Sequence, residues 1–102
     1  MSRSKYGNVR TGKYASKKEA NIAAQLAVLF RAGKILDLKE QVHIVLIPGK
    51  GKVRGITYVA DFVYNDLNGD LHVLDAKGFR TPVYKLKKKM CKLLWDIEIE
   101  EV

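Results

Sequence analysis

Residues 57–77 read TYVADFVYNDLNGDLHVLDAK, and this stretch decides the fold. Two apolar segments flank a central part rich in Asn, Asp and Gly, at positions 65–70. The pair Asn68-Gly69 favours a tight turn, because both residue types tolerate a positive φ angle. The stretch therefore predicts two strands, at about 57–64 and 70–77, that pair antiparallel through a short turn.

The predicted hairpin carries charged residues in rows that are otherwise apolar. Side chains alternate across a strand, so Asp75 and Lys77 continue the row of Leu71 and Val73, while Asp61 lies among valines in the preceding strand. A buried carboxylate is costly unless it is paired or bound to a cation. The turn brings Asp61 and Asp75 to one face, where a divalent cation would relieve their repulsion. Hard carboxylate oxygens suit Mg²⁺ or Mn²⁺. The alternative is a structural ion pair between Asp75 and Lys77.

The segment before the hairpin predicts a helix and a strand. Ser16 and Glu19 have the spacing of a capping box at the start of a helical pattern over residues 14–32, and Gly33 is a natural stop. Residues 41–47, QVHIVLI, are apolar on both faces, which predicts an interior strand.

The segment after the hairpin predicts a second helix and a last strand. Thr81 is a candidate N-cap, with Pro82 at the first helical position. We expect the buried face of this helix to carry Val83, Leu86, Met90 and Leu93. Alternation over residues 97–100 predicts a short strand with one wet face. The order α-β-β-β-α-β predicts an α/β domain with a mixed sheet flanked by helices.

Composition limits both the domain count and the kind of partner. The chain has 102 residues with 47% hydrophobic content, so we expect a flexible basic arm at 1–13 and a single domain at 14–102. The net charge of +8 favours a polyanionic partner, either nucleic acid or an anionic membrane surface. A membrane partner is disfavoured, because no apolar run is long enough to span a bilayer and the apolar face of the lysine-rich helix is needed for the core. Cys91 is the single cysteine, and a reducing, cytoplasmic setting is the default.

The order of the charged motifs resembles a known superfamily. Asp61, then Asp75-Ala76-Lys77 after a hairpin, with Glu19 on a leading helix, resembles the PD-(D/E)XK nucleases. The segments SKKEA (16–20), YVADFVY (58–64) and LDAKGFRTPVYKLKKK (74–89) are similar to a family of short phage-encoded domains, described as uncharacterised or as Holliday junction resolvase-like. The resemblance covers the chain from about residue 14 to the last strand. Ala60 stands at the proline of the motif's name, a position where proline is often absent.

The resemblance implies a role for each of these residues. Asp61 and Asp75 would bind Mg²⁺, for which Mn²⁺ substitutes, together with the backbone carbonyl of Ala76. Glu19 would complete the acidic cluster directly or through water, although the acid of a capping box is an alternative reading. Lys77 would position or activate the attacking water and offset charge on the scissile phosphate.

The expected function is Mg²⁺-dependent endonuclease activity on DNA, selective for branched or junction structures. The resemblance also implies a homodimer, and the cytoplasm of a bacterial host if the protein is phage-encoded. The alternative is a basic nucleic-acid-binding module without catalysis, whose acids are structural. The residues expected to contact DNA are Lys13, Tyr14, Ser16, Gln41, Arg80, Thr81, Lys85 and Lys88.

Overall fold

The computed structural model describes residues 14–76 and 80–102. The elements in chain order are α1 (Lys17–Arg31), β1 (Ile35–Ile47), β2 (Ile56–Asp66), β3 (Leu71–Asp75), α2 (Pro82–Trp95) and β4 (Ile99–Glu101). The predicted α/β domain with the order α-β-β-β-α-β is thereby confirmed. The predicted arm at 1–13, with Lys13, and the predicted catalytic Lys77 lie outside the described residues.

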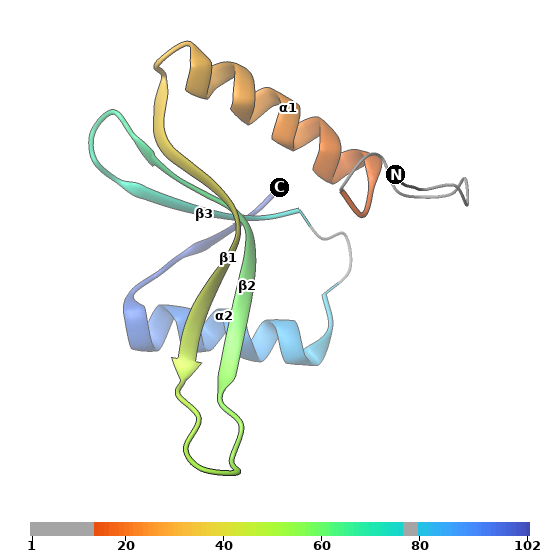
Figure 1. Ribbon diagram of the computed structural model, residues 1–102, viewed down its shortest axis with the longest axis vertical. Helices are drawn as coiled ribbons and strands as arrows, with labels where there is room; N and C mark the ends of the chain where they lie inside the picture. The colour runs from red at the N-terminus through yellow and green to blue at the C-terminus, as the bar shows by residue number, and fades with distance from the viewer. Residues whose placement is uncertain (1–13, 77–79) are drawn as a thin grey trace.

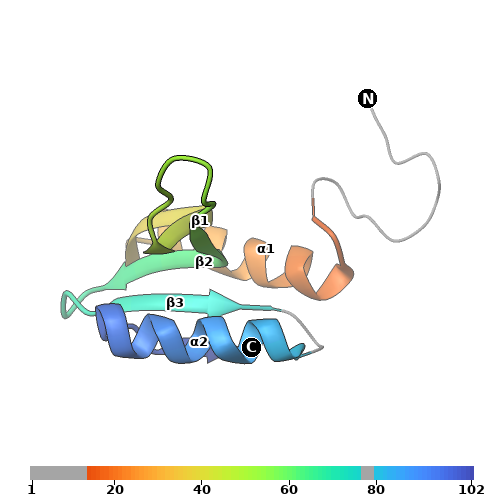
Figure 2. The ribbon, with the colours of Figure 1, turned by 90° about the horizontal axis from the view of Figure 1, so that it is seen from below.

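The four strands form one mixed sheet in the order β1-β2-β3-β4. The pairs β1/β2 and β2/β3 are antiparallel, whereas β3 and β4 are parallel and α2 makes the crossover between them. The two helices lie on opposite faces of the sheet (Figures 1 and 2). One core cluster contains Tyr84 and Cys91 of α2 and is called the α2-side cluster, and the other contains Ala23 and Leu26 of α1 and is called the α1-side cluster. The neighbouring residues Val73 and Leu74 of β3 pack in the α2-side and the α1-side cluster, respectively. In the described part of the chain, neither helix is long and apolar enough to span a membrane.

The turn between β2 and β3 forms as its sequence predicts. Oδ1 of Asp66 accepts hydrogen bonds from the backbone N–H groups of Asn68 (2.8 Å) and Asp70 (3.0 Å). Gly69 has φ +88°, which a residue with a side chain adopts only at a cost. These contacts fix the hairpin register, and so they fix which residues face each other at its far end.

Both helices begin at the predicted caps. The Ser16 hydroxyl oxygen accepts the backbone N–H of Glu19 at 3.1 Å, and the Thr81 hydroxyl oxygen accepts that of Tyr84 at 3.0 Å. Gly33, with φ +74°, directly follows the end of α1. The hydroxyls of Ser16 and Thr81 therefore serve the helix termini, a role distinct from the DNA contact expected for them.

The prediction that residues 41–47 form an interior strand is wrong. β1 begins at Ile35 and lies at the edge of the described sheet, where β2 is its one neighbouring strand. Val45 and Ile47 are 48% and 45% exposed. β-Branched residues favour extended backbone wherever it occurs, so an apolar run does not distinguish an edge strand from an interior one.

The predicted buried face of α2 is also wrong. Tyr84 and Cys91 are the buried residues of this helix, while Leu86 and Leu93 are 55% and 76% exposed. Val83 is exposed too, and of the predicted set only Met90 packs against the core. Lysines flank the buried face and reach polar partners with their amines, as Lys87 does at the carbonyl of Thr57 (2.8 Å). Simple apolar periodicity misses this arrangement, because lysine stems cover apolar surface as well.

Candidate functional site

Asp61 and Asp75 lie on the adjacent strands β2 and β3. The β2/β3 register ends with Phe62 paired to Leu74, and Asp61 and Asp75 are the next residues of the two strands beyond that pair. Asp61 is 5% exposed and Asp75 is 1% exposed. Besides burial, the charges of both carboxylates raise the pKa of Tyr58, so the fold brings the two predicted aspartates into one buried region.

The side-chain alternation of β2 changes at Asp61. Tyr58 and Ala60 belong to the α2-side cluster, but Phe62 belongs to the α1-side cluster, where strict alternation would keep all three together. Val63 packs against the same cluster as Ala60, although strict alternation would put residues three positions apart on opposite faces. Asp61 thus stands where β2 passes from one helix layer to the other.

Gln41 of β1 lies across from this change and links three elements. Its neighbours Glu40 and Val42 pair with Phe62 and Ala60, which places Gln41 opposite Asp61. Gln41 has φ +53°, a left-handed conformation that costs about 1 kcal/mol or more for a residue with a Cβ. Its Nε2 donates to Oε2 of Glu19 at 3.3 Å and, more weakly, to Oδ1 of Asp61 at 3.5 Å.

These contacts define the role of Glu19. Its backbone N–H caps the helix through Ser16, while its carboxylate reaches across to Gln41. The carboxylate of Glu19 therefore points from α1 toward the strand pair that carries Asp61. Glu19, Gln41 and Asp61, which are far apart in the sequence, meet in one place.

Asp61 also holds the chain that follows β3. Its Oδ2 accepts the backbone N–H of Ala76 at 2.8 Å in a buried contact. Ala76 is 5% exposed. Charge-assisted hydrogen bonds of this kind are stronger than neutral ones, so Asp61 anchors the segment directly after Asp75.

Tyr58 is a site residue that the sequence interpretation missed. Its hydroxyl donates to Oδ2 of Asp75 at 2.5 Å, and the tyrosine is 4% exposed. Burial, and then the bond to Asp75, raise the pKa of Tyr58 well above its ordinary value. The signal available in the sequence was a tyrosine in an apolar strand, since a buried hydroxyl needs an acceptor.

A second acidic position lies beside Asp75 on β4. Glu101 pairs with Asp75 in the parallel register, and its Oε2 accepts bonds from the Tyr84 hydroxyl (2.8 Å) and Lys88 Nζ (3.1 Å). Arg80 forms an ion pair with the other oxygen of Glu101. The bond from Tyr84, followed by Lys88, lowers the pKa of Glu101. Two expected DNA contacts, Arg80 and Lys88, are thus tied to a carboxylate next to the aspartate pair.

The other expected DNA contacts are spread over the surface. The hydroxyl of Tyr14 donates to the carboxylate of Glu40 at 3.0 Å, and its ring packs against the α1-side cluster. Lys85 is exposed on α2. Of the predicted site, the structure brings together Glu19, Gln41, Asp61, Ala76 and Asp75, with Arg80 and Lys88 adjacent through Glu101.

The donor set agrees with a hard divalent cation. Two buried carboxylates lie in one region of the fold, and their oxygens are hard ligands of the kind that Mg²⁺ prefers. Within residues 14–76 and 80–102, however, no group of three or more His, Cys, Asp or Glu side chains forms a ready metal cluster. Gln41 stands between Glu19 and Asp61, so the carboxylates of Asp61 and Asp75 are the pair that would hold an ion.

Comparison with known proteins places the chain in a family without assigning it an activity. The chain belongs to the family described as "Protein of unknown function (DUF1064)", whose model matches residues 3–99. No curated protein and no solved structure matches it.

Proposed function

We propose that this member of a family of unknown function is a Mg²⁺-dependent endonuclease that hydrolyses phosphodiester bonds in branched or junction DNA. The observation that carries the proposal is the burial of two carboxylates, Asp61 and Asp75, in one region of the adjacent strands β2 and β3. The chain's net charge of +8 makes this buried acidic pair an exception in a molecule suited to polyanions.

In this proposal Asp61 and Asp75 hold the cation, for which Mn²⁺ substitutes. A bound cation supplies positive charge at the scissile phosphate and acidifies water. Tyr58 fixes one oxygen of Asp75, and the Ala76 N–H fixes one oxygen of Asp61, so the carboxylates are held in place before substrate arrives. Gln41 and Glu19 border the pair and offer polar groups to water or to a phosphate oxygen.

Lys77 has a separate place in the proposal. It follows Asp75 by two residues, and we propose that its ammonium orients the attacking water and offsets the charge that develops on the phosphate. Arg80 and Lys88 would leave Glu101 for a substrate phosphate, since both already lie next to Asp75.

A homodimer is part of the proposal. Val83, Leu86 and Leu94 recur at helical spacing along α2 and are 60%, 55% and 52% exposed. A second copy would bury this apolar stripe and provide a second site for a two-fold symmetric junction. Light scattering at working concentration tests this, and the mass of a single protomer would contradict it.

The second candidate function is a nucleic-acid-binding module without catalysis. It accounts for the net charge, and it treats the hydrogen bonds of Asp61 and Asp75 as purely structural. It gives no functional reason for two aspartates to be buried in one region of a basic protein.

The deciding experiment offers the protein labelled four-way junction, flap, single-stranded and linear duplex DNA, with Mg²⁺, Mn²⁺ or EDTA. Asp75→Asn, which keeps the shape of the side chain and an acceptor for Tyr58, is the matched variant, and circular dichroism checks its fold. We expect metal-dependent cleavage by the native chain and its loss in the variant. Binding without cleavage in any metal, equal for both proteins, would establish the binding module instead.

A further inference from the structure

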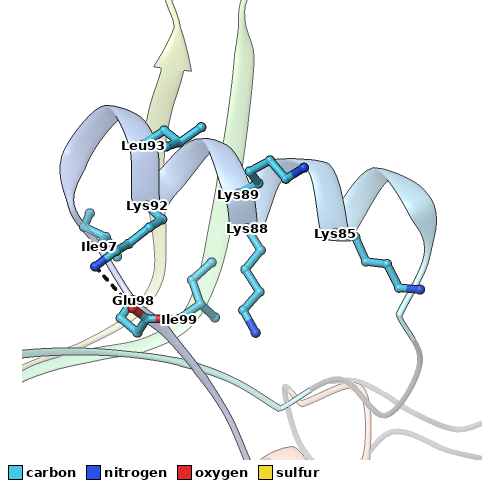
Figure 3. Close-up of a pocket in the computed structure, with 8 residues that line it drawn as sticks. All are labelled: Lys85, Lys88, Lys89, Lys92, Leu93, Ile97, Glu98 and Ile99. Carbon is cyan, nitrogen blue, oxygen red and sulfur yellow. Dashed lines mark ion pairs between the residues drawn. The ribbon is translucent and has the colours of Figure 1, made fainter.

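A groove of about 300 Å³ runs between α2 and the segment that leads into β4. Its lining residues are Lys85, Lys88, Lys89, Lys92, Leu93, Ile97, Glu98 and Ile99 (Figure 3). The four lysines stand at spacings of three and four residues, so they share one face of the helix. The groove therefore combines a basic wall with an apolar part made by one leucine and two isoleucines.

The lysines differ in how their charge is balanced. Lys92 is paired with Asp96 (3.0 Å) and Glu98 (3.3 Å), which raise its pKa, and Lys88 is paired with Glu101 (3.1 Å). Within the described residues, the side-chain amine of neither Lys85 nor Lys89 has a hydrogen-bond or ion-pair partner. The wall thus presents two uncompensated positive charges about 6 Å apart along the helix axis.

The groove begins beside the candidate site. Lys88 contacts Glu101, and Glu101 pairs with Asp75 in the sheet. From Lys85 to Lys92 the lysine face extends about 10 Å along the helix. A strand with one phosphate at the aspartate pair would reach the lysine wall with its neighbouring phosphates.

The apolar part of the groove distinguishes between forms of nucleic acid. Leu93 is 76% exposed and Ile97 is half-buried, so apolar surface is open to a ligand here. In a duplex the phosphates face outward and the bases are stacked inside, so a duplex would use only the lysines. An unpaired strand also presents the faces of its bases, which bind apolar surface without regard to sequence.

We propose that this groove binds an unpaired nucleic-acid strand, with its phosphates on Lys85 and Lys89 and its bases against Leu93 and Ile97. The proposal rests on the proposed function, since it names the part of a branched substrate that this surface receives. A flap or the single-stranded arm of an opened junction has such a strand next to the bond to be cut.

The experiment measures equilibrium binding by fluorescence anisotropy in EDTA, so that no cleavage is needed. The probes are a single-stranded oligonucleotide and the duplex of the same sequence, each over a range of salt concentrations. For Lys85→Gln/Lys89→Gln we expect the salt slope of single-strand binding to fall by about 1.4, from two lost phosphate contacts. The matched control, Lys50→Gln/Lys52→Gln in the β1–β2 loop, removes the same charge elsewhere and should leave that slope within error.

The apolar part of the proposal has its own variant. Leu93→Ala changes an exposed side chain, so the fold is kept, and we expect it to weaken single-strand binding several-fold without affecting the duplex. Leu67→Ala, in the β2–β3 turn and 63% exposed, is the control. Equal weakening of single-strand and duplex binding by Leu93→Ala, or equal effects of the two lysine pairs on single-strand binding, would overturn the proposal. Binding to anionic vesicles that excess oligonucleotide does not displace would assign the groove to a membrane surface instead.

The two proposals fail separately. If single-strand binding depends on Lys85, Lys89 and Leu93 but the protein cleaves no DNA, the groove proposal is supported and the nuclease proposal is contradicted. The opposite result would be metal-dependent cleavage that is lost in Asp75→Asn but is unchanged on single strands and flaps in the groove variants. That result would support the nuclease and contradict the role of the groove.

Discussion

The hydroxyl of Tyr58 lies 2.5 Å from Oδ2 of Asp75, and both side chains are almost fully buried. The bond joins two strands that run side by side, and its acceptor is one of the two buried carboxylates. A buried carboxylate that keeps a short hydrogen bond is held in one orientation, which is what a metal ligand requires.

Removal of this hydroxyl should therefore cost stability. In Tyr58→Phe we expect the free energy of unfolding to fall by about 1–3 kcal/mol, because a buried acceptor loses its donor. Urea unfolding measures the change. In the Asp75→Asn background the same substitution should cost less, because a neutral acceptor is less expensive to leave unsatisfied. Equal costs in both backgrounds would show that the carboxylate is not what the tyrosine stabilises.

Divalent cations should stabilise the native chain. If Asp61 and Asp75 hold Mg²⁺, saturation to 100 times the dissociation constant adds about 2.7 kcal/mol to the free energy of unfolding. We expect the melting temperature to rise with Mg²⁺ in the native chain and to stay constant in Asp61→Asn and Asp75→Asn. A rise of the same size in all three proteins would locate cation binding elsewhere.

Ser16 and Glu19 allow capping and site roles to be separated. Ser16→Ala removes the cap acceptor and should lower stability by about 1 kcal/mol while leaving the cleavage rate unchanged at a temperature where the protein is folded. Glu19→Gln keeps the backbone cap, so it should change stability little and reduce cleavage at least tenfold. Unchanged cleavage in Glu19→Gln would show that Glu19 acts only in the cap of α1.

His72 should make stability depend on pH. Its ring nitrogens lie 2.8 Å from Asp66 Oδ2 and 2.7 Å from Glu100 Oε2, and the bond to Asp66 is the main cause that raises the pKa of His72. A pKa raised in the folded state stabilises the fold below the unfolded value of about 6.5, and this stabilisation is lost as pH rises through the folded value.

The comparison of His72→Gln with the native chain tests this sign. We expect the difference in unfolding free energy to be largest near pH 5–6 and to shrink toward pH 9. Protonation of Asp66 ends the pairing at still lower pH, because the bond to His72 lowers the pKa of Asp66. His43→Gln, on the exposed part of β1, is the control. A difference that grows with rising pH would contradict the assignment.

Local chemistry made part of this fold predictable. The turn at Asn68-Gly69 and the caps at Ser16 and Thr81 depend on neighbours within four residues, and each formed as expected. The hairpin register then follows from the turn, and with it the meeting of Asp61 and Asp75.

Contacts between distant segments were less accessible to prediction. The approach of Gln41 to Glu19 depends on a left-handed residue in β1, for which glutamine gives no signal. The rotation of α2 depends on which side chains the sheet accepts, and Tyr84 is buried where Leu86 was expected. The hydrogen bond from Tyr58 to Asp75 joins side chains of two strands. The alternation of side chains along a strand does not specify which of them come within hydrogen-bond distance.

The irregularities of β1 also affect how the protein behaves in a concentrated solution. Among residues 14–76 and 80–102, no strand pairs with the outer side of β1, and long regular edges of this kind invite further strands and aggregation. Register shifts interrupt β1 between Leu36 and Lys39 and between Val45 and Ile47, and Asp37 and Gln41 have left-handed backbone. An incoming strand would find only short matching stretches of donors and acceptors, so we expect the left-handed backbone that sets Gln41 beside Asp61 to disfavour edge-to-edge aggregation as well.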